Sequence, residues 1–86
     1  MLVGLKNLLH LPVETKSGGK LGKVVEVNLD TDGHLVREYI VRPALFSQRT
    51  FLIRPAQVIA VTAEKMVVED GALKATELSV SSMMAV

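Results

Sequence analysis

The sequence predicts an all-β domain, and three features of the chain support this fold class. Apolar residues alternate with polar ones in short segments, glycine-containing turns separate these segments, and no long helical pattern interrupts them. The most informative segment covers residues 19–30, between a turn at Ser17-Gly18-Gly19 and a second turn at residues 30–33. We therefore expect a small antiparallel β-barrel or a sandwich.

The chain has 86 residues, which is the length of one small domain. A domain of this size buries only ~60% of the surface that its unfolded chain exposes. Hydrophobic residues nevertheless make up 49% of the sequence. Some apolar surface should therefore remain outside the core, and we expect a homodimer or a larger assembly.

Charge and residue usage exclude several classes of protein. The net charge of +1 is far from the strongly basic balance of most nucleic-acid-binding domains. The chain has no cysteine, which excludes disulfides, cysteine-ligated zinc and thiol catalysis. Residues 1–13 lack the features of a signal peptide, and no uncharged run approaches the ~20 residues of a membrane helix. We expect a soluble, cytoplasmic protein.

The first part of the chain predicts a helical turn and two strands. Leucines at helical spacing in residues 5–9 suggest one short turn of helix, and the alternation over residues 9–13 predicts a first strand with Pro12 at an edge. The second strand should end at Leu29. Its alternation predicts one face with Leu21, Val25, Val27 and Leu29, and another with Val24, Glu26 and Asn28.

The rest of the chain predicts four further strands. Residues 34–42 form a third strand that is apolar on both faces, which two-sided burial, a bulge or an interface could each explain. Residues 49–54 predict a fourth strand, with Phe51 and Ile53 on one face. Residues 58–62 and 66–69 predict the fifth and sixth strands.

Two motifs resemble ion or phosphate sites, but both fit turns better. Asn28, Asp30, Asp32 and Gly33 match the opening of an EF-hand calcium loop, yet Tyr39 stands where that loop needs a bidentate glutamate. Residues 18–23 resemble a phosphate loop with one residue too few and no following helix. We interpret the first as a β-turn and the second as a hairpin with solubilising lysines.

The sequence gives no support for catalysis or for a bound cofactor. The two histidines, His10 and His34, have no acidic residue at a metal-ligand spacing. The serines gather near the C-terminus without the partners of a catalytic triad. We predict no catalytic, metal or cofactor-binding residues and no small-molecule substrate.

Six cations form a candidate basic patch for RNA or an acidic protein, although few aromatic residues accompany them for base stacking. Scattered solvated charge is the simpler explanation. The candidates are Lys20, Lys23, Arg37, Arg42, Arg49 and Arg54.

Apolar residues at loop or tail positions are the candidates for a protein interface. Leu45 and Phe46 lie in a loop, where two large apolar side chains need something to cover them. The alternative is that the loop folds over an open end of the barrel. Met83 and Met84 near the C-terminus have flexible side chains that adapt to a partner. Val36 and Ile40 complete this candidate interface.

Several segments together resemble the PRC-barrel family. They are residues 9–13, the glycine- and lysine-containing segment 18–24, Tyr39-Ile40-Val41, residues 51–58 and residues 66–68. The resemblance covers roughly residues 5–71 and contains no catalytic signature. It implies a compact six-stranded β-barrel that works as an assembly module. The composition shifts towards Ala, Ser, Thr and Met after this region, so we expect a domain at residues 1–72 and a tail at 73–86 that docks on the barrel or on a partner.

Members of this family occur in the photosynthetic reaction centre, in a ribosome-maturation factor and as small stand-alone proteins, some of which act in archaeal cell division. This chain resembles a stand-alone member. We predict a non-enzymatic, homo-oligomeric protein-interaction module. The alternatives are an RNA- or ribosome-associated accessory protein, an adaptor in prokaryotic cell division, and a carrier of a ligand inside the barrel, which six strands leave little room for.

Overall fold

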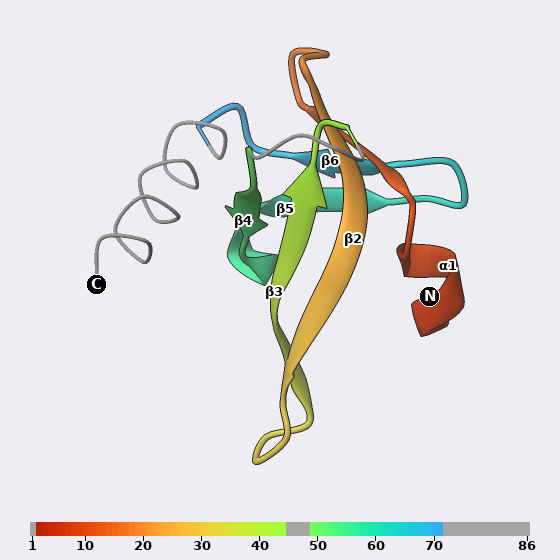
Figure 1. Cartoon of the computed structure of the whole chain (residues 1–86), viewed down its shortest axis with the longest axis vertical. Helices are drawn as coiled ribbons and strands as arrows, with labels where there is room; N and C mark the ends of the chain where they lie inside the picture. The colour runs from red at the N-terminus through yellow and green to blue at the C-terminus, as the bar shows by residue number, and fades with distance from the viewer. Residues whose placement is uncertain (1, 45–48, 72–86) are drawn as a thin grey trace.

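The computed structural model describes residues 2–44 and 49–71, and in this part of the chain it is mostly β (Figure 1). The predicted tail and the interface candidates Leu45, Phe46, Met83 and Met84 lie outside the described residues. The described elements are α1 (Leu5–Leu8), β1 (Pro12–Thr15), β2 (Lys20–Asp30), β3 (Leu35–Arg42), β4 (Phe51–Ile53), the 3-10 helix η1 (Pro55–Gln57), β5 (Val58–Val61) and β6 (Met66–Val68). The predicted strands and the helical turn are confirmed, with ends that differ by at most three residues.

The six described strands form one sheet in the order β4-β3-β2-β1-β6-β5. Strands β1 to β4 are joined by antiparallel pairings, as expected, but β1 and β6 are parallel. The prediction of a wholly antiparallel barrel is therefore wrong for this one pair. The chain passes from β4 through η1 to the other end of the sheet, and β5 and β6 then add as an antiparallel pair whose direction leaves β6 parallel to β1. In Figure 1, β5 and β6 run across the direction of β2 and β3.

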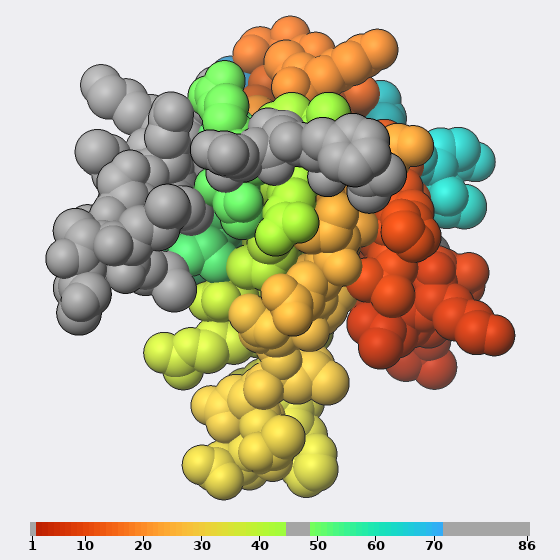
Figure 2. All heavy atoms as spheres, viewed as in Figure 1, coloured from red at the N-terminus to blue at the C-terminus, as the bar shows by residue number. Residues whose placement is uncertain are grey.

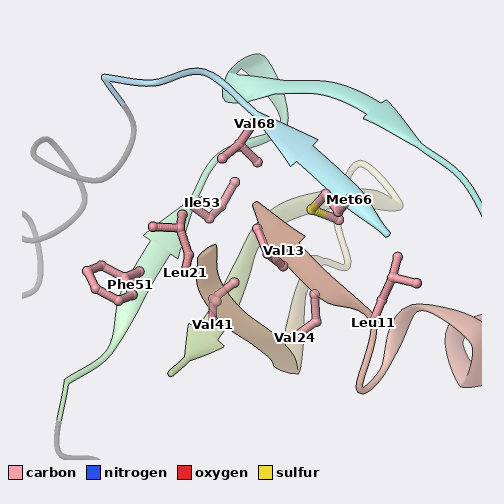
Figure 3. Packing of buried hydrophobic residues seen from close by; sticks show 9 residues of the cluster. All are labelled: Leu11, Val13, Leu21, Val24, Val41, Phe51, Ile53, Met66 and Val68. Carbon is pink, nitrogen blue, oxygen red and sulfur yellow. The ribbon is translucent and has the colours of Figure 1, made fainter. Parts of the chain in front are cut away.

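The strands wrap around a single apolar core (Figure 3). The cluster includes Val24 from β2, Val41 from β3, Ile53 from β4 and Met66 from β6, each with 0% of its surface exposed. Its other members are Leu11, Val13, Leu21, Phe51 and Val68. Phe51 and Ile53 share the core face of β4, as the alternation predicts. Side chains fill the interior, which is typical of a barrel with few strands.

The predicted faces of β2 are correct for Leu21 and Val27 but wrong for Val24 and Val25. Leu21 is buried and Val27 packs against the core, as expected, but Val25 is exposed and Val24 belongs to the core. The register of β2 shifts against β1 near Leu21 and against β3 at Val25. Each β-bulge adds one residue, which moves the following side chains to the opposite face.

The turn between β1 and β2 is tied to the chain that follows β6. The backbone N–H and the hydroxyl of Ser17 both donate to Oδ1 of Asp70, at 2.8 and 2.9 Å. Inside the turn, the Gly19 N–H donates to Oγ1 of the buried Thr15 at 2.9 Å. These bonds give the predicted Ser17-Gly18-Gly19 hairpin its shape and tie it to the residue two positions after β6.

Candidate interaction surface

The hairpin of β2 and β3 extends well beyond the strands that flank it. Strand β1 pairs with β2 only between Lys20 and Lys23, and β4 pairs with β3 between Tyr39 and Val41. We call the remaining ribbon, residues 26–38, the arm. In Figures 1 and 2 the arm projects from the body of the domain as the yellow segment, furthest from the β1–β2 turn.

The arm exposes large apolar side chains near its tip. Leu29 is 58% exposed and Leu35 is 67% exposed. Residues opposite each other in an antiparallel pair lie on the same face. Leu29 therefore shares one face with Val36, and Leu35 shares the other with Asp30.

Polar contacts give the arm a defined shape. The Asp32 N–H donates to Oδ1 of Asp30 at 3.0 Å in the turn at the tip, which supports the interpretation of this segment as a β-turn. Nδ2 of Asn28 donates to Oε2 of Glu38 at 2.8 Å across the two strands. The carboxylates of Asp30 and Glu38 therefore have roles within the hairpin. Along with Glu26 and Asp32 they outnumber Arg37, so the arm carries a net negative charge.

A cationic hollow lies at the base of the arm. Its volume is about 350 Å³, and its described lining consists of His10, Lys23, Val25, Arg42, Pro43 and Ala44. Lys23 and Arg42 are directly opposite in the β2–β3 register, so their charges share one face. None of the described residues that line this hollow is acidic. A second hollow of about 490 Å³ lies beside it, and Lys23 and Pro43 line both.

The structure separates the members of the predicted basic patch. Lys23 and Arg42 meet in the cationic hollow, and Lys20 lines the neighbouring hollow. Arg37 instead lies on the arm. The two remaining members flank β4: Cζ of Arg49 lies 5.3 Å from the ring centroid of Phe51, and Arg54 precedes η1.

The predicted interface residues that the structure describes lie on β3. Val36 is half-buried on the arm, opposite Leu29, and Ile40 is half-buried nearer the body, opposite Leu52 of β4. The sequence analysis missed Leu29 and Leu35 as surface residues. The signal was the length of the second predicted strand, which is too long for the first strand to pair along all of it.

The chain, with its bulged β2 and small filled core, can now be compared with known protein families. The family model of the PRC-barrel domain matches residues 2–74. The chain belongs to the PRC-barrel family. The resemblance of the sequence segments to this family is therefore confirmed. A comparison with curated proteins gave no significant match.

PRC-barrel domains are in general non-catalytic modules. Across residues 2–44 and 49–71 of this PRC-barrel domain, no three histidine or acidic side chains gather as metal ligands would. In the same residues no helix has the length and apolar character needed to cross a membrane. The features of the domain that call for a functional explanation are the arm and the cationic hollow.

Proposed function

We propose that this PRC-barrel domain is a non-enzymatic protein-interaction module that self-associates, and that the arm is its main contact surface. The observation that carries the proposal is the exposure of Leu29 and Leu35 on a ribbon that projects from the core. A two-stranded ribbon is marginally stable in water by itself. Covering its leucines would both remove apolar surface from water and stabilise the ribbon.

The backbone of the arm supports the same proposal. Beyond Val24, no described strand pairs with the outer edge of β2, and before Tyr39 none pairs with the outer edge of β3. Unpaired strand edges readily accept another chain, and natural proteins usually blunt them with bulges or charge. The arm has a bulge and several charges, but it also has leucines at its tip. The bulge and the charges oppose indiscriminate strand pairing, while the exposed leucines offer apolar surface to a partner.

Light scattering and sedimentation of the purified chain test this function. At ~100 μM, a complex with a micromolar dissociation constant would be almost fully formed. We expect the wild type to be a dimer or a larger assembly. The Leu29→Ser/Leu35→Ser variant should associate more weakly, so it should dissociate at a higher protein concentration than the wild type does. Ile59→Ser is the matched control, since Ile59 is 46% exposed on β5, away from the arm. A strictly monomeric wild type at ~100 μM contradicts the proposal.

The RNA- or ribosome-associated function is a second candidate because Lys23 and Arg42 meet in one hollow. Such binding depends on phosphate contacts and weakens steeply with salt. An RNA oligonucleotide that binds at low salt, and loses this binding in a Lys23→Glu/Arg42→Glu variant, would favour it. A role as an adaptor in cell division and a cytoplasmic location stay predictions from the sequence.

A further inference from the structure

We propose that the tip of the arm of one copy seats in the cationic hollow of a second copy, in a head-to-tail contact. This inference rests on the proposed self-association and names the two surfaces that meet. The tip offers Asp30 and Asp32 beside Leu35, and the hollow offers Lys23 and Arg42 around Val25 and Pro43. Each surface therefore combines charge with an apolar residue, and the charges have opposite sign.

The charge of the described chain is divided between these two regions. The arm has four carboxylates and one guanidinium, whereas the rest of the described residues have eight lysines and arginines and four acidic residues. Two copies placed arm to hollow bring opposite charges together. Two copies placed arm to arm, or hollow to hollow, bring like charges together, which costs free energy and suppresses those arrangements.

The hollow has an unfavourable feature that an anionic partner would relieve. Lys23 and Arg42 lie opposite each other on adjacent strands, and like charges in this position destabilise a sheet. A carboxylate placed between them converts the repulsion into two charge-assisted hydrogen bonds. Val25, which is 36% exposed, and Pro43 supply apolar surface for the leucine beside that carboxylate.

The arm cannot fill the hollow of its own chain. Val25 lines the hollow, and the tip of the arm begins six residues later, about 20 Å away at the rise of an extended strand. Both strands of the arm are paired with each other along this length, so the ribbon does not fold back on its base. An arm that occupies the hollow must therefore belong to another molecule. The volume of about 350 Å³ suits a few side chains, since it is near the lower limit for ligand pockets.

Head-to-tail contacts leave one free arm and one free hollow at the ends of each open assembly. Such contacts form rings when the rotation between copies closes, and open chains when it does not. A ring buries every arm, and an open chain buries every arm except the one at its free end. We therefore expect the average size of the assembly to rise with concentration until any ring closes.

A charge-swap experiment tests this contact directly. The hollow variant is Lys23→Glu/Arg42→Glu. The tip variant is Thr31→Lys/Asp32→Lys, which keeps the Asp30 carboxylate that accepts the backbone N–H of residue 32. Each variant alone places like charges in the contact, so we expect its dissociation constant to rise at least about tenfold. In an equimolar mixture, contacts between opposite charges are again available, so we expect association to return.

Circular dichroism and thermal unfolding establish that both variants are folded. Lys16→Glu/Arg54→Glu is the matched control, because it changes two cations that do not line the cationic hollow, and it should associate like the wild type. Raising the salt concentration should weaken the wild-type assembly, since the contact is partly electrostatic.

The outcomes separate the two proposals. A monomeric wild type overturns the proposed function and this contact together. Wild-type association that neither charge variant weakens overturns the contact and leaves the proposed function in place. Variants that dissociate but do not reassociate on mixing also overturn the proposed contact. If the hollow variant has then also lost RNA binding, the hollow is a site for nucleic acid.

Discussion

Gly22 of β2 lies directly against the backbone of Arg42 at the end of β3. A β-carbon at position 22 would overlap the Arg42 carbonyl oxygen and would lie 2.7 Å from Cα of Pro43. Gly22 also has a φ of +135°, in a region that residues with a β-carbon rarely adopt. This close approach sets the path of the chain from Arg42 to Pro43, two residues that line the cationic hollow.

We predict that Gly22→Ala destabilises the domain by about 3 kcal/mol or more, because the new methyl group adds a clash with rigid backbone to the cost of the positive φ. Gly18→Ala is the control. Gly18 also has a positive φ, of +98°, but a methyl group added there would meet nothing within 4 Å, so we expect a cost of about 1–2 kcal/mol. Urea unfolding of both variants measures the difference, and equal costs would mean that the close approach does not constrain the domain.

Asp70 should make the stability of the domain depend on pH. The Ser17 backbone N–H, and then the Ser17 hydroxyl, hold the pKa of the Asp70 carboxyl below its usual value of 3.8. A carboxyl with a lowered pKa in the folded state stabilises that state above its unfolded pKa, and this contribution is lost as the pH falls through the folded pKa. We expect the stability advantage of the wild type over Asp70→Asn to shrink between about pH 5 and pH 2.

The asparagine in this variant keeps an oxygen that can accept the Ser17 bonds, so the comparison isolates the charge. Ser17→Ala removes the hydroxyl donor but leaves the backbone N–H, which is the larger cause of the lowered pKa. The pKa of the Asp70 carboxyl in the Ser17→Ala variant, followed by NMR, should therefore lie between its value in the wild type and the ordinary value for aspartate. Parallel pH profiles for the wild type and Asp70→Asn would contradict this account.

Two isoleucines on the strands at opposite ends of the sheet order should differ sharply in their contribution to stability. Ile53 is 0% exposed in the core, and Ile59 is 46% exposed at the bulge of β5. We expect Ile53→Ala to cost about 2–5 kcal/mol, from lost burial and the cavity that remains. Ile59→Ala should cost less than about 1 kcal/mol. Chemical unfolding of the two variants makes this comparison, and similar costs would show that β4 does not close the core.

The ion pair between Glu14 and Lys65 should contribute little. Nζ of Lys65 lies 2.7 Å from Oε1 of Glu14, but the side chains of Lys65 and Glu14 are 46% and 25% exposed. Exposed pairs of this kind typically contribute ~0.2–1 kcal/mol, and salt weakens them. A double-mutant cycle with alanine at both positions should give a coupling energy in this range. A coupling that is much larger, or that salt does not change, would point to a more buried pair.

The sequence predicted most of the strands because local chemistry determines them. Alternation and turn residues marked the strands, and the buried pair Phe51 and Ile53 followed from spacing alone. The same local rules failed where the pattern depends on a partner strand. The bulges near Leu21 and at Val25 place Val24 rather than Val25 in the core, and no residue type marks such bulges unambiguously.

The direction of β6 and the arm could not be predicted for a related reason. A short apolar strand such as Met66–Val68 carries no signal for parallel or antiparallel pairing, since this depends on how the chain passes through η1. Leu29 and Leu35 have the residue type of a core, and their exposure follows from the unequal lengths of β1 and β2. The cationic hollow joins His10 and Arg42 from distant parts of the sequence.

The pairing of Val13 with Met66 also has a consequence for synthesis of the protein. Strand β1 leaves the ribosome before the other described strands, and one of its sides stays unpaired until β6 has been made. Contacts between such distant residues slow folding. During that interval the glycine-rich β1–β2 turn and the nascent hairpin must remain soluble without a finished core. A protein truncated at any point before Met66 should therefore aggregate rather than fold into a smaller domain.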